Sequence, residues 1–525
     1  MKSLRLFKRT FNVLDLVMIT IIFGFFLFFY IIGHARHFSF LTSINDLGHF
    51  DQAVWSASQN GVQINSDIFN YKINHLGFHF TPILYFFSPL YKIHPTAIWL
   101  ILSQAFSVAI AALPIYFLTE HLTSSKSVSI IWSLIFLLNP FIQNAVAWDF
   151  HPIVLTLPFI TLALYGLLKK NFYLVLFSSI VFLLCKEHLG IMVSGFGALW
   201  YYKHKDIKGG AILLALGFFC FFFICEYLMP MFSPTGNHLM MSDGFGQLSR
   251  YSWLGESTKE IIINIIKNPY KVFCISIFKM QGYEYFILLL LPFLGLPILN
   301  LCFMIPSIAD LLANILSVNT MPKSIFSYHS ATIIPFLCLS AIFGCIKLSK
   351  ITKKFTIMEL SLFILLSTAL LNFAFSPLPI PKSSNFWAPK KIRFSKNSSF
   401  EKVKELLPPS LSLSVQANIG AHFTQRELVF SFPNKIGEAD AIVLNLDSPT
   451  NNIYRKEPMH IGSLAHHLQI RPEEYLNIVL DLLNNKKYGI CYWNNNWLIL
   501  KKNQNNLYPV DSVKKRIRIL REKWR

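Results

Sequence analysis

Charged residues are scarce in this chain, and acidic residues are the scarcest. Of 525 residues only 14% are Asp, Glu, Lys or Arg, whereas 53% are hydrophobic. Soluble domains carry about 25% charged residues, and their surface helices keep a polar face. Runs such as "IIFGFFLFFYII" and "LLALGFFCFFFIC" have no polar face. These absences exclude an ordinary soluble protein and predict a chain whose solvent is lipid.

Paired cysteines and nucleic-acid motifs are also missing. Seven of the eight cysteines lie in or near apolar segments, Cys491 lies in a polar one, and no CxxC spacing occurs, so neither a disulfide framework nor a thiolate metal site is expected. No nucleic-acid fold signature accompanies the net charge of +20, so we expect no nucleic-acid partner. Those charges instead orient helices and meet the phosphates of the lipid bilayer.

About eleven segments are long and apolar enough to be membrane spans. Continuous apolar runs predict helices, because the strands of a membrane barrel would alternate. The first run lacks a small-residue cleavage site and is read as a retained anchor rather than a signal peptide. The expected spans are 14–33, 95–119, 128–147, 153–168, 172–185, 189–202, 211–229, 283–303, 304–319, 325–347 and 356–376. The fold class is an all-α polytopic membrane bundle over residues 1–376.

Lys and Arg collect in cytoplasmic loops, which orients the bundle. The basic N-terminus (Lys2, Arg5, Lys8, Arg9) is placed inside, and counting spans then puts the turns at Lys126, Lys169–Lys170, Lys203–Lys208 and Lys347–Lys354 inside as well. The outer face receives the loops 34–94 and 230–282, the shorter connections and the tail. Most Asp, Glu and His residues that neighbour apolar spans fall on this outer side, and charged groups at membrane depth usually mark a functional site.

The first outer loop carries the acidic candidates. In "NDLGHFDQAVWSASQNG", apolar residues share one face of a short helix that we expect to lie on the membrane surface. Asp46 is a candidate catalytic base or an N-cap, and Asp51 is a second catalytic candidate or a solvated residue. His75 and His79 are four residues apart and can face one way, as substrate-binding residues or as packing residues.

The remaining substrate-binding candidates come from four other outer segments. "WDFHP" places Asp149 and His151 after the third span, and "KEHLG" places Lys186, Glu187 and His188 after the fifth. Lys186 and Glu187 either pair with one another or divide between a phosphate and a carboxylate partner. "DGFGQLSRYSWLGES" supplies Asp243 and Arg250 beside glycines that suit a phosphate, and "SYHSATIIP" supplies Tyr328 and His329.

The tail, residues 377–525, reads as a small soluble α/β domain outside the membrane. Strand character appears in "SLSVQA", "ELVFSF", "AIVLNLD" and "GICYWNNNWLILKK", and "RPEEYLNIVLDLLNN" is an amphipathic helix. The last helix, "VDSVKKRIRILREKWR", carries an apolar stripe between basic residues. It rests either on an anionic membrane surface or on its own domain.

Several segments together resemble an uncharacterised prokaryotic family of multi-pass membrane proteins, domain of unknown function 2079. They are "NDLGHFDQAVW", "HFTPIL", "DFHP", "KEHLG", "RYSWLG", "YHSATIIPFL" and "SVQANIGAHFTQRELVFSFP". The layout is distantly similar to glycosyltransferases of the GT-C architecture, which have a long first outer loop and an acidic residue soon after the first span. The resemblance implies that Asp46 matches that acidic residue, with Asp51 the next candidate.

The expected function is that of a lipid-dependent glycosyltransferase of the prokaryotic cytoplasmic membrane. The resemblance implies a polyprenyl-phosphate sugar donor and a glycan, lipid or protein acceptor. We predict no protein-bound metal site, although a divalent cation could balance charge on the donor. A transporter or lipid flippase and a non-catalytic envelope scaffold are the alternatives, since charges at one membrane face suit all three.

Overall fold

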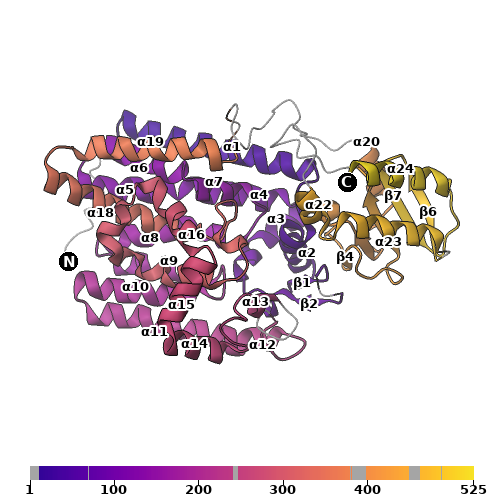
Figure 1. The fold of residues 1–525 in the computed structure, drawn as a ribbon, viewed down its shortest axis with the longest axis horizontal. Helices are drawn as coiled ribbons and strands as arrows, with labels where there is room; N and C mark the ends of the chain where they lie inside the picture. Colours follow the sequence, from indigo (N-terminus) through magenta and orange to yellow (C-terminus); the bar gives the residue numbers. More distant parts are fainter. Residues whose placement is uncertain are drawn as a thin grey trace.

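The computed structural model describes residues 11–68, 70–239, 246–378, 380, 398–447, 461–485 and 487–524. A bundle of helices forms one part of the molecule, and a small sheet domain sits at one end of it (Figure 1). The basic residues at positions 2–9 and Asp243 lie outside the described residues. The predicted fold class, a helical membrane bundle with a small α/β tail, is confirmed.

Most of the bundle is built by helices that follow one another closely along the chain. They are α1 (Val13–Phe38), α2 (His49–Asn60), α3 (Ser88–Ile93), α4 (Ile98–Ile110), α5 (Ala112–Thr123), α6 (Lys126–Leu137), α7 (Pro140–Ala147), α8 (Leu157–Leu168), α9 (Phe172–Leu183), α10 (Leu189–His204), α11 (Ile207–Phe223), α12 (Met229–Phe232), α13 (Gly246–Ser249), α14 (Thr258–Lys267), α15 (Pro269–Cys274), α16 (Gly282–Leu290), α17 (Ile308–Leu316), α18 (Ile334–Thr352) and α19 (Ile357–Phe375). Two short strands, β1 (Ile64–Asn65) and β2 (Ile73–Asn74), pair antiparallel in the first loop.

Within the described residues, six helical stretches are long and apolar enough to cross a membrane, or eight if two bent pairs each count as one. The expected eleven also include shorter apolar helices such as 152–168, 172–183 and 282–293. The expected span 128–147 is bent by 53° between α6 and α7. Asn139 caps the second helix by accepting from the Phe141 N–H, and Pro140 at its first position cannot continue the α6 hydrogen bonds.

The structure adds detail to the expected spans and loops at two places. The break expected between 303 and 304 lies at Leu294–Gly295, where both residues have positive φ, so the next apolar stretch runs over Leu296–Leu316. The expected outer loop 230–282 contains helices α14 and α15, bent by 99° from one another. Ile262 and Ile266 of α14 are exposed, as suits a helix whose apolar face meets lipid.

The basic turns lie together at the bundle end near the start of α1. Lys126 Nζ is 2.6 Å from Asp15 Oδ2, and Lys169 Nζ is 3.1 Å from His121 Nδ1. The ring of His204 bonds the Leu167 carbonyl oxygen at 2.8 Å. The tight turns at 123–126, 168–172 and 204–207 therefore occupy one end, as the orientation rule asks of loops on one side of a membrane.

The tail folds as a five-stranded sheet covered by helices. Its elements are α20 (Ser398–Glu405), β3 (Leu413–Val415), α21 (Ala417–Gly420), β4 (Val429–Ser431), β5 (Ala441–Asn445), α22 (Ile461–Leu468), α23 (Pro472–Asn484), β6 (Tyr488–Trp493), β7 (Trp497–Lys502) and α24 (Val510–Lys523). The strand order is β4-β3-β5-β7-β6, with β3 parallel to both its neighbours and β7 antiparallel to both of its own. Each strand predicted in the tail is present.

The final helix packs on its own domain rather than on a membrane. Val513, Ile517, Leu520 and Trp524 are buried in the same apolar core as β6, β7 and α23. The sequence left open whether this helix rests on a membrane surface or on its own domain, and the structure shows that it packs on its own domain.

The expected surface helix of the first loop is instead buried on both sides. The apolar residues Leu47, Phe50, Ala53 and Val54 face the bundle, while Asp51, Gln52 and Ser56 on the polar side are also buried. The Gln52 side chain donates to the Arg426 carbonyl oxygen, and Ser66 bonds both the N–H and the carbonyl of Val429. The prediction of a helix lying on an open membrane surface is wrong, because the tail domain covers α2.

Candidate functional site

The predicted site residues come from distant parts of the chain and meet at the bundle end beside the tail domain. They stand in the turn before α2, in α2 and the loop that follows it, in the connections α7–α8, α9–α10 and α17–α18, and just after α13. Asp46 lies in a single π-helical turn, Ile44–Gly48, that runs into α2. Ser43 is the N-cap of that turn and bonds the Asn45 N–H, so Asp46 is not the capping residue.

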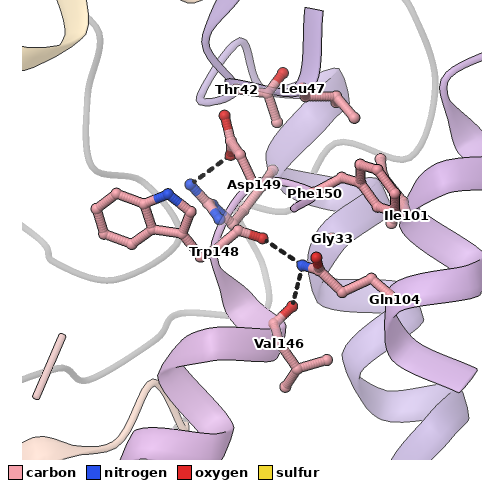
Figure 2. Close-up of a pocket in the computed structure, with 10 residues that line it drawn as sticks. Gly33, Thr42, Leu47, Ile101, Gln104, Val146, Trp148, Asp149 and Phe150 are labelled. Carbon is pink, nitrogen blue, oxygen red and sulfur yellow. Dashed lines mark hydrogen bonds and ion pairs between the residues drawn. The ribbon is translucent and has the colours of Figure 1, made fainter. Parts of the chain in front are cut away.

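A buried ion pair anchors the connection after α7. Arg36 Nη2 at the end of α1 lies 3.1 Å from Asp149 Oδ1, and the Ser43 N–H donates to Asp149 Oδ2 at 2.6 Å. Burial raises the pKa of Asp149 to about 6 even against the Arg36 guanidinium, which leaves the carboxylate mostly ionised at neutral pH. Gln104 of α4 holds the same connection by donating to the Trp148 and Val146 carbonyl oxygens (Figure 2).

These groups line a small pocket with a volume of about 10 Å³, roughly the room that one water molecule needs. Figure 2 shows Trp148 and Asp149 on one side of it and Ile101 and Gln104 on the other. The pocket is too small for a sugar or a lipid headgroup, so any substrate must bind beside it, where the side chains of the cluster are partly exposed.

Asp46 and His151 lie side by side, and the hydrogen of the neutral imidazole points away from the carboxylate. The His151 Nδ1 lies 3.0 Å from the Asp149 carbonyl oxygen, which can only accept, so Nδ1 carries hydrogen. The other ring nitrogen, Nε2, faces Asp46 Oδ1 at 3.5 Å. Burial lowers the pKa of His151 to about 4 and raises the pKa of Asp46. Because Nδ1 carries the hydrogen, the Nε2 lone pair of the neutral His151 faces the Asp46 carboxylate. Two acceptors then face each other, and a proton bound between them would relieve their repulsion.

Lys186 is held between a histidine and a carboxylate. Its Nζ lies 2.6 Å from His79 Nδ1 and 3.6 Å from Glu187 Oε1, while the Phe80 N–H donates to Glu187 Oε2. An ammonium can only donate, so His79 accepts at Nδ1 and is neutral, with its hydrogen on Nε2. Burial also lowers the pKa of His79, which favours the neutral form. Burial alone would raise the pKa of Glu187, but Lys186 and then His188 bring it below its ordinary value.

A stack of rings continues from His151 across the α17–α18 connection. Tyr328 stacks on His151 with ring centroids 3.8 Å apart and on His329 at 4.3 Å. Burial, followed by the Arg250 guanidinium, lowers the pKa of His329 to about 3. Arg250 also acts on Lys186 and Tyr328, which places it at this cluster. His188 Nε2 is 3.5 Å from Asp310 Oδ1, whose second oxygen accepts from Thr332.

Two predicted residues have all their side-chain polar atoms bound by partners that hold the first loop. Both Asp51 oxygens accept hydroxyl hydrogen bonds at 2.7 Å, one from Tyr91 and one from Thr424 of the tail domain. His75 is buried with Nδ1 2.7 Å from Asn65 Oδ1 and Nε2 2.7 Å from Thr81 Oγ1. Both residues hold the first loop in shape, and no contact given for the described residues joins Asp51 to Asp46.

Sequence reasoning missed several residues of the cluster. Arg36 sits at the end of a span, where a lone cation is ordinarily read as an anchor. His49 lies one helical turn after Asp46, with its Nδ1 3.0 Å from both oxygens of the buried Asp67. Asp310 sits inside an apolar helix and His466 in the tail. The spacing of His49 from Asp46 was a usable signal, because residues three apart on a helix share a face.

No group of three or more His, Cys, Asp or Glu side chains in the described part of the chain is arranged to hold a metal ion. Binding of a divalent cation therefore stays a prediction. Its ligands would include the phosphate oxygens of the donor as well as protein side chains.

Fold and cluster together define a polytopic α-helical membrane protein with a charged site at one end of its bundle. The chain belongs to the family described as "Predicted membrane protein (DUF2079)", which matches residues 36–498. No curated protein sequence matches it. Among solved structures, it is similar to the crystal structure of ArnT from Cupriavidus metallidurans bound to undecaprenyl phosphate, at 10% identity and a TM-score of 0.45, over 92% of this chain and 97% of that chain.

Proposed function

We propose that the chain is a GT-C-like glycosyltransferase that transfers a sugar from a polyprenyl-phosphate donor to an envelope acceptor at the outer face of the cytoplasmic membrane. The observation that carries this proposal is that Asp46, Lys186 and Arg250 gather around the stacked rings of His151 and Tyr328 at one end of the bundle. A carboxylate beside cations is what sugar transfer from a lipid phosphate requires, since one group takes a proton while the others stabilise a leaving phosphate.

In this reaction Asp46 accepts the proton of the acceptor hydroxyl. His151 holds the Asp46 carboxylate at 3.5 Å and can share the proton after it is taken. Lys186 and Arg250 balance the charge that develops on the polyprenyl phosphate, and His79 offers its Nε2 hydrogen to the same oxygens. The apolar helices at the cluster keep the polyprenyl chain in lipid while the headgroup reaches the charged site.

The test supplies radiolabelled polyprenyl-phosphate sugars to membranes that carry the wild type or Asp46→Asn. Loss of a general base typically lowers the rate about 10²–10⁴-fold. The rate of sugar transfer by Asp46→Asn should therefore be at least about 100-fold below that of the wild type. Transfer that is unchanged in Asp46→Asn would remove Asp46 as the base. No transfer with any donor would favour the alternatives.

The pH dependence of transfer gives a second readout of the same base. Burial raises the pKa of Asp46 above its ordinary 3.8. The base must be ionised to act, so the rate should fall as pH drops, beginning at a higher pH than for a free aspartate. A rate that rises on acidification would contradict the role of Asp46 as base.

A flippase is the second candidate, and one buried network favours it. Asp310 of α17 accepts from Thr332, Tyr285 of α16 bonds Ser330 and Asn314, and all five side chains are buried. Buried polar groups inside spans can line a pathway. A fluorescent polyprenyl phosphate in liposomes distinguishes the two functions, because a flippase moves the lipid between leaflets without any sugar acceptor and a transferase does not.

A further inference from the structure

The tail domain brings a side chain to the edge of the charged site. His466 of α22 lies beside Trp148, with ring centroids 6.3 Å apart, and its imidazole is the group that most strongly favours the ionised form of Asp46. Leu464 and Leu468 of the same helix are buried in the tail's own core. The opposite face of α22 therefore presents the exposed His466 to the bundle.

The position of the tail domain on the bundle is built by several independent contacts. His422 stacks on His37 with ring centroids 3.8 Å apart and bonds the His37 carbonyl oxygen at 2.8 Å. Phe40 and Ile44 of the first loop lie inside the tail's second core with Phe400 and Trp497. A domain fixed by polar and apolar contacts of this kind holds α22 in a defined place beside Trp148.

Three groups of different chemistry lie where α22 meets the bundle. Trp148 is half-buried and offers an aromatic face, and its indole N–H is buried without a hydrogen bond of good geometry. The Asp46 side chain is 29% exposed and supplies a carboxylate. His466 adds a second ring with a donor or an acceptor. Arg250 and Asp46 both act on Tyr328, whose ring centroid lies 6.2 Å from that of Trp148.

A sugar ring matches this combination. One face of a pyranose presents C–H groups that pack on an indole face, and its rim presents hydroxyls that need both acceptors and donors. A phosphate does not match, because Asp46 would repel it. A polyprenyl chain does not match either, since two of the three groups are polar.

We propose that Trp148, Asp46 and His466 form the acceptor subsite and that it binds the terminal sugar ring of a glycan. This inference rests on the proposed function and narrows its acceptor class. The bound hydroxyl loses its proton to Asp46 while its oxygen forms a bond to the anomeric carbon of the donor sugar. The bond from that carbon to the phosphate oxygen breaks, and its electron pair leaves with the polyprenyl phosphate.

The test measures binding of simple sugars to the full chain in detergent micelles by saturation-transfer NMR. The probes are methyl glycosides of glucose, galactose, mannose and N-acetylglucosamine, and sorbitol is the open-chain control that has hydroxyls but no ring face. At least one methyl glycoside should bind, and sorbitol should not. Trp148→Ala and His466→Ala should each raise the dissociation constant by about tenfold, because each removes one stacking or hydrogen-bonding partner.

His94→Ala is the matched control. His94 is an exposed histidine of the first outer loop, and its replacement should leave sugar binding unchanged. His466 is exposed too, so its removal leaves no cavity, and Trp148→Phe preserves a ring if Trp148→Ala fails to fold. The proposal is overturned if no glycoside binds, if sorbitol binds equally, or if both variants bind as the wild type does. Because no donor is present, this result is independent of whether Asp46→Asn abolishes transfer.

Discussion

At the scale of single residues, the ionisable side chains of the site fall into two groups. Arg36, Lys186 and His188 each lie within 3.6 Å of a carboxylate oxygen, on Asp149, Glu187 and Asp310 respectively. Asp46 has a neutral histidine as its nearest ionisable partner, and Arg250 has no ion pair in the described residues. Since an unpaired charge near lipid is costly, Arg250 has the most to gain from an anionic ligand such as a lipid phosphate.

The pairing of Lys186 with Glu187 predicts how their variants behave. Lys186→Met leaves the Glu187 carboxylate buried with one backbone donor, a loss of the order of 3–5 kcal/mol for a broken buried pair. Adding Glu187→Gln should restore part of the melting temperature in detergent, because no uncompensated charge remains. The exposed pair Lys72–Glu427 is the control, and the same two changes there should alter the melting temperature little. A double variant no more stable than Lys186→Met would contradict the pairing.

The sequence predicted the cluster through the one-sided placement of its ionisable residues. Asp46, His79, Asp149, His151, Lys186 and the rings 328–329 do meet in the structure. Partners contributed across long stretches of chain could not be found that way. His466 reaches the site over more than 400 residues, and Asp51 is bound by Thr424. Such contacts depend on how the tail domain docks, which no local pattern of residues specifies.

At the scale of elements, small residues bring α10 and α11 into close contact. A Cβ added to Gly197 would lie 2.5 Å from the Leu214 nitrogen and 2.6 Å from the Gly210 carbonyl oxygen. Helices in lipid associate through such close packing, since apolar side chains gain little by leaving the hydrocarbon. The period of apolar residues predicted these helices but not which of their faces touch.

Gly197→Leu should therefore force α10 and α11 apart and lower the melting temperature, with a cost of about 1–3 kcal/mol for overpacking. Gly24→Leu is the matched control, because nothing lies within 4 Å of a Cβ at Gly24 and both changes gain the same helix propensity. Equal melting temperatures for the two variants would contradict the close contact.

The contact of α2 with the tail domain gives a second prediction at this scale. Asp51→Ala leaves the Tyr91 and Thr424 hydroxyls buried without their acceptor, at about 1–3 kcal/mol each. Limited proteolysis should then release the tail domain faster than in the wild type. Asp447→Ala removes a half-exposed carboxylate from Arg516 and should change the rate little. Release at the wild-type rate from Asp51→Ala would show that the docking does not depend on this carboxylate.

At the scale of the whole molecule, the basic turns and the acidic cluster occupy opposite ends of the bundle. Orientation follows if the basic end faces the cytoplasm. In a cysteine-free background, Asn60→Cys near the site should react with an impermeant maleimide added to intact cells, and Lys170→Cys only after permeabilisation. Both residues are exposed. Labelling of both from one side would contradict the arrangement of the bundle across the membrane.

The central claim is that a phosphorylated lipid binds at the charged end of the bundle, and its most direct test is equilibrium binding of radiolabelled polyprenyl phosphate to the purified chain. The wild type should bind it. Arg250→Gln and the charge-balanced pair Lys186→Met with Glu187→Gln should each bind at least about tenfold more weakly, as expected when one charge-assisted contact worth about 1.5–3 kcal/mol is lost. Lys259→Gln with Lys267→Gln, on the exposed face of α14, should bind as the wild type does. Undiminished binding in both site variants would contradict the claim.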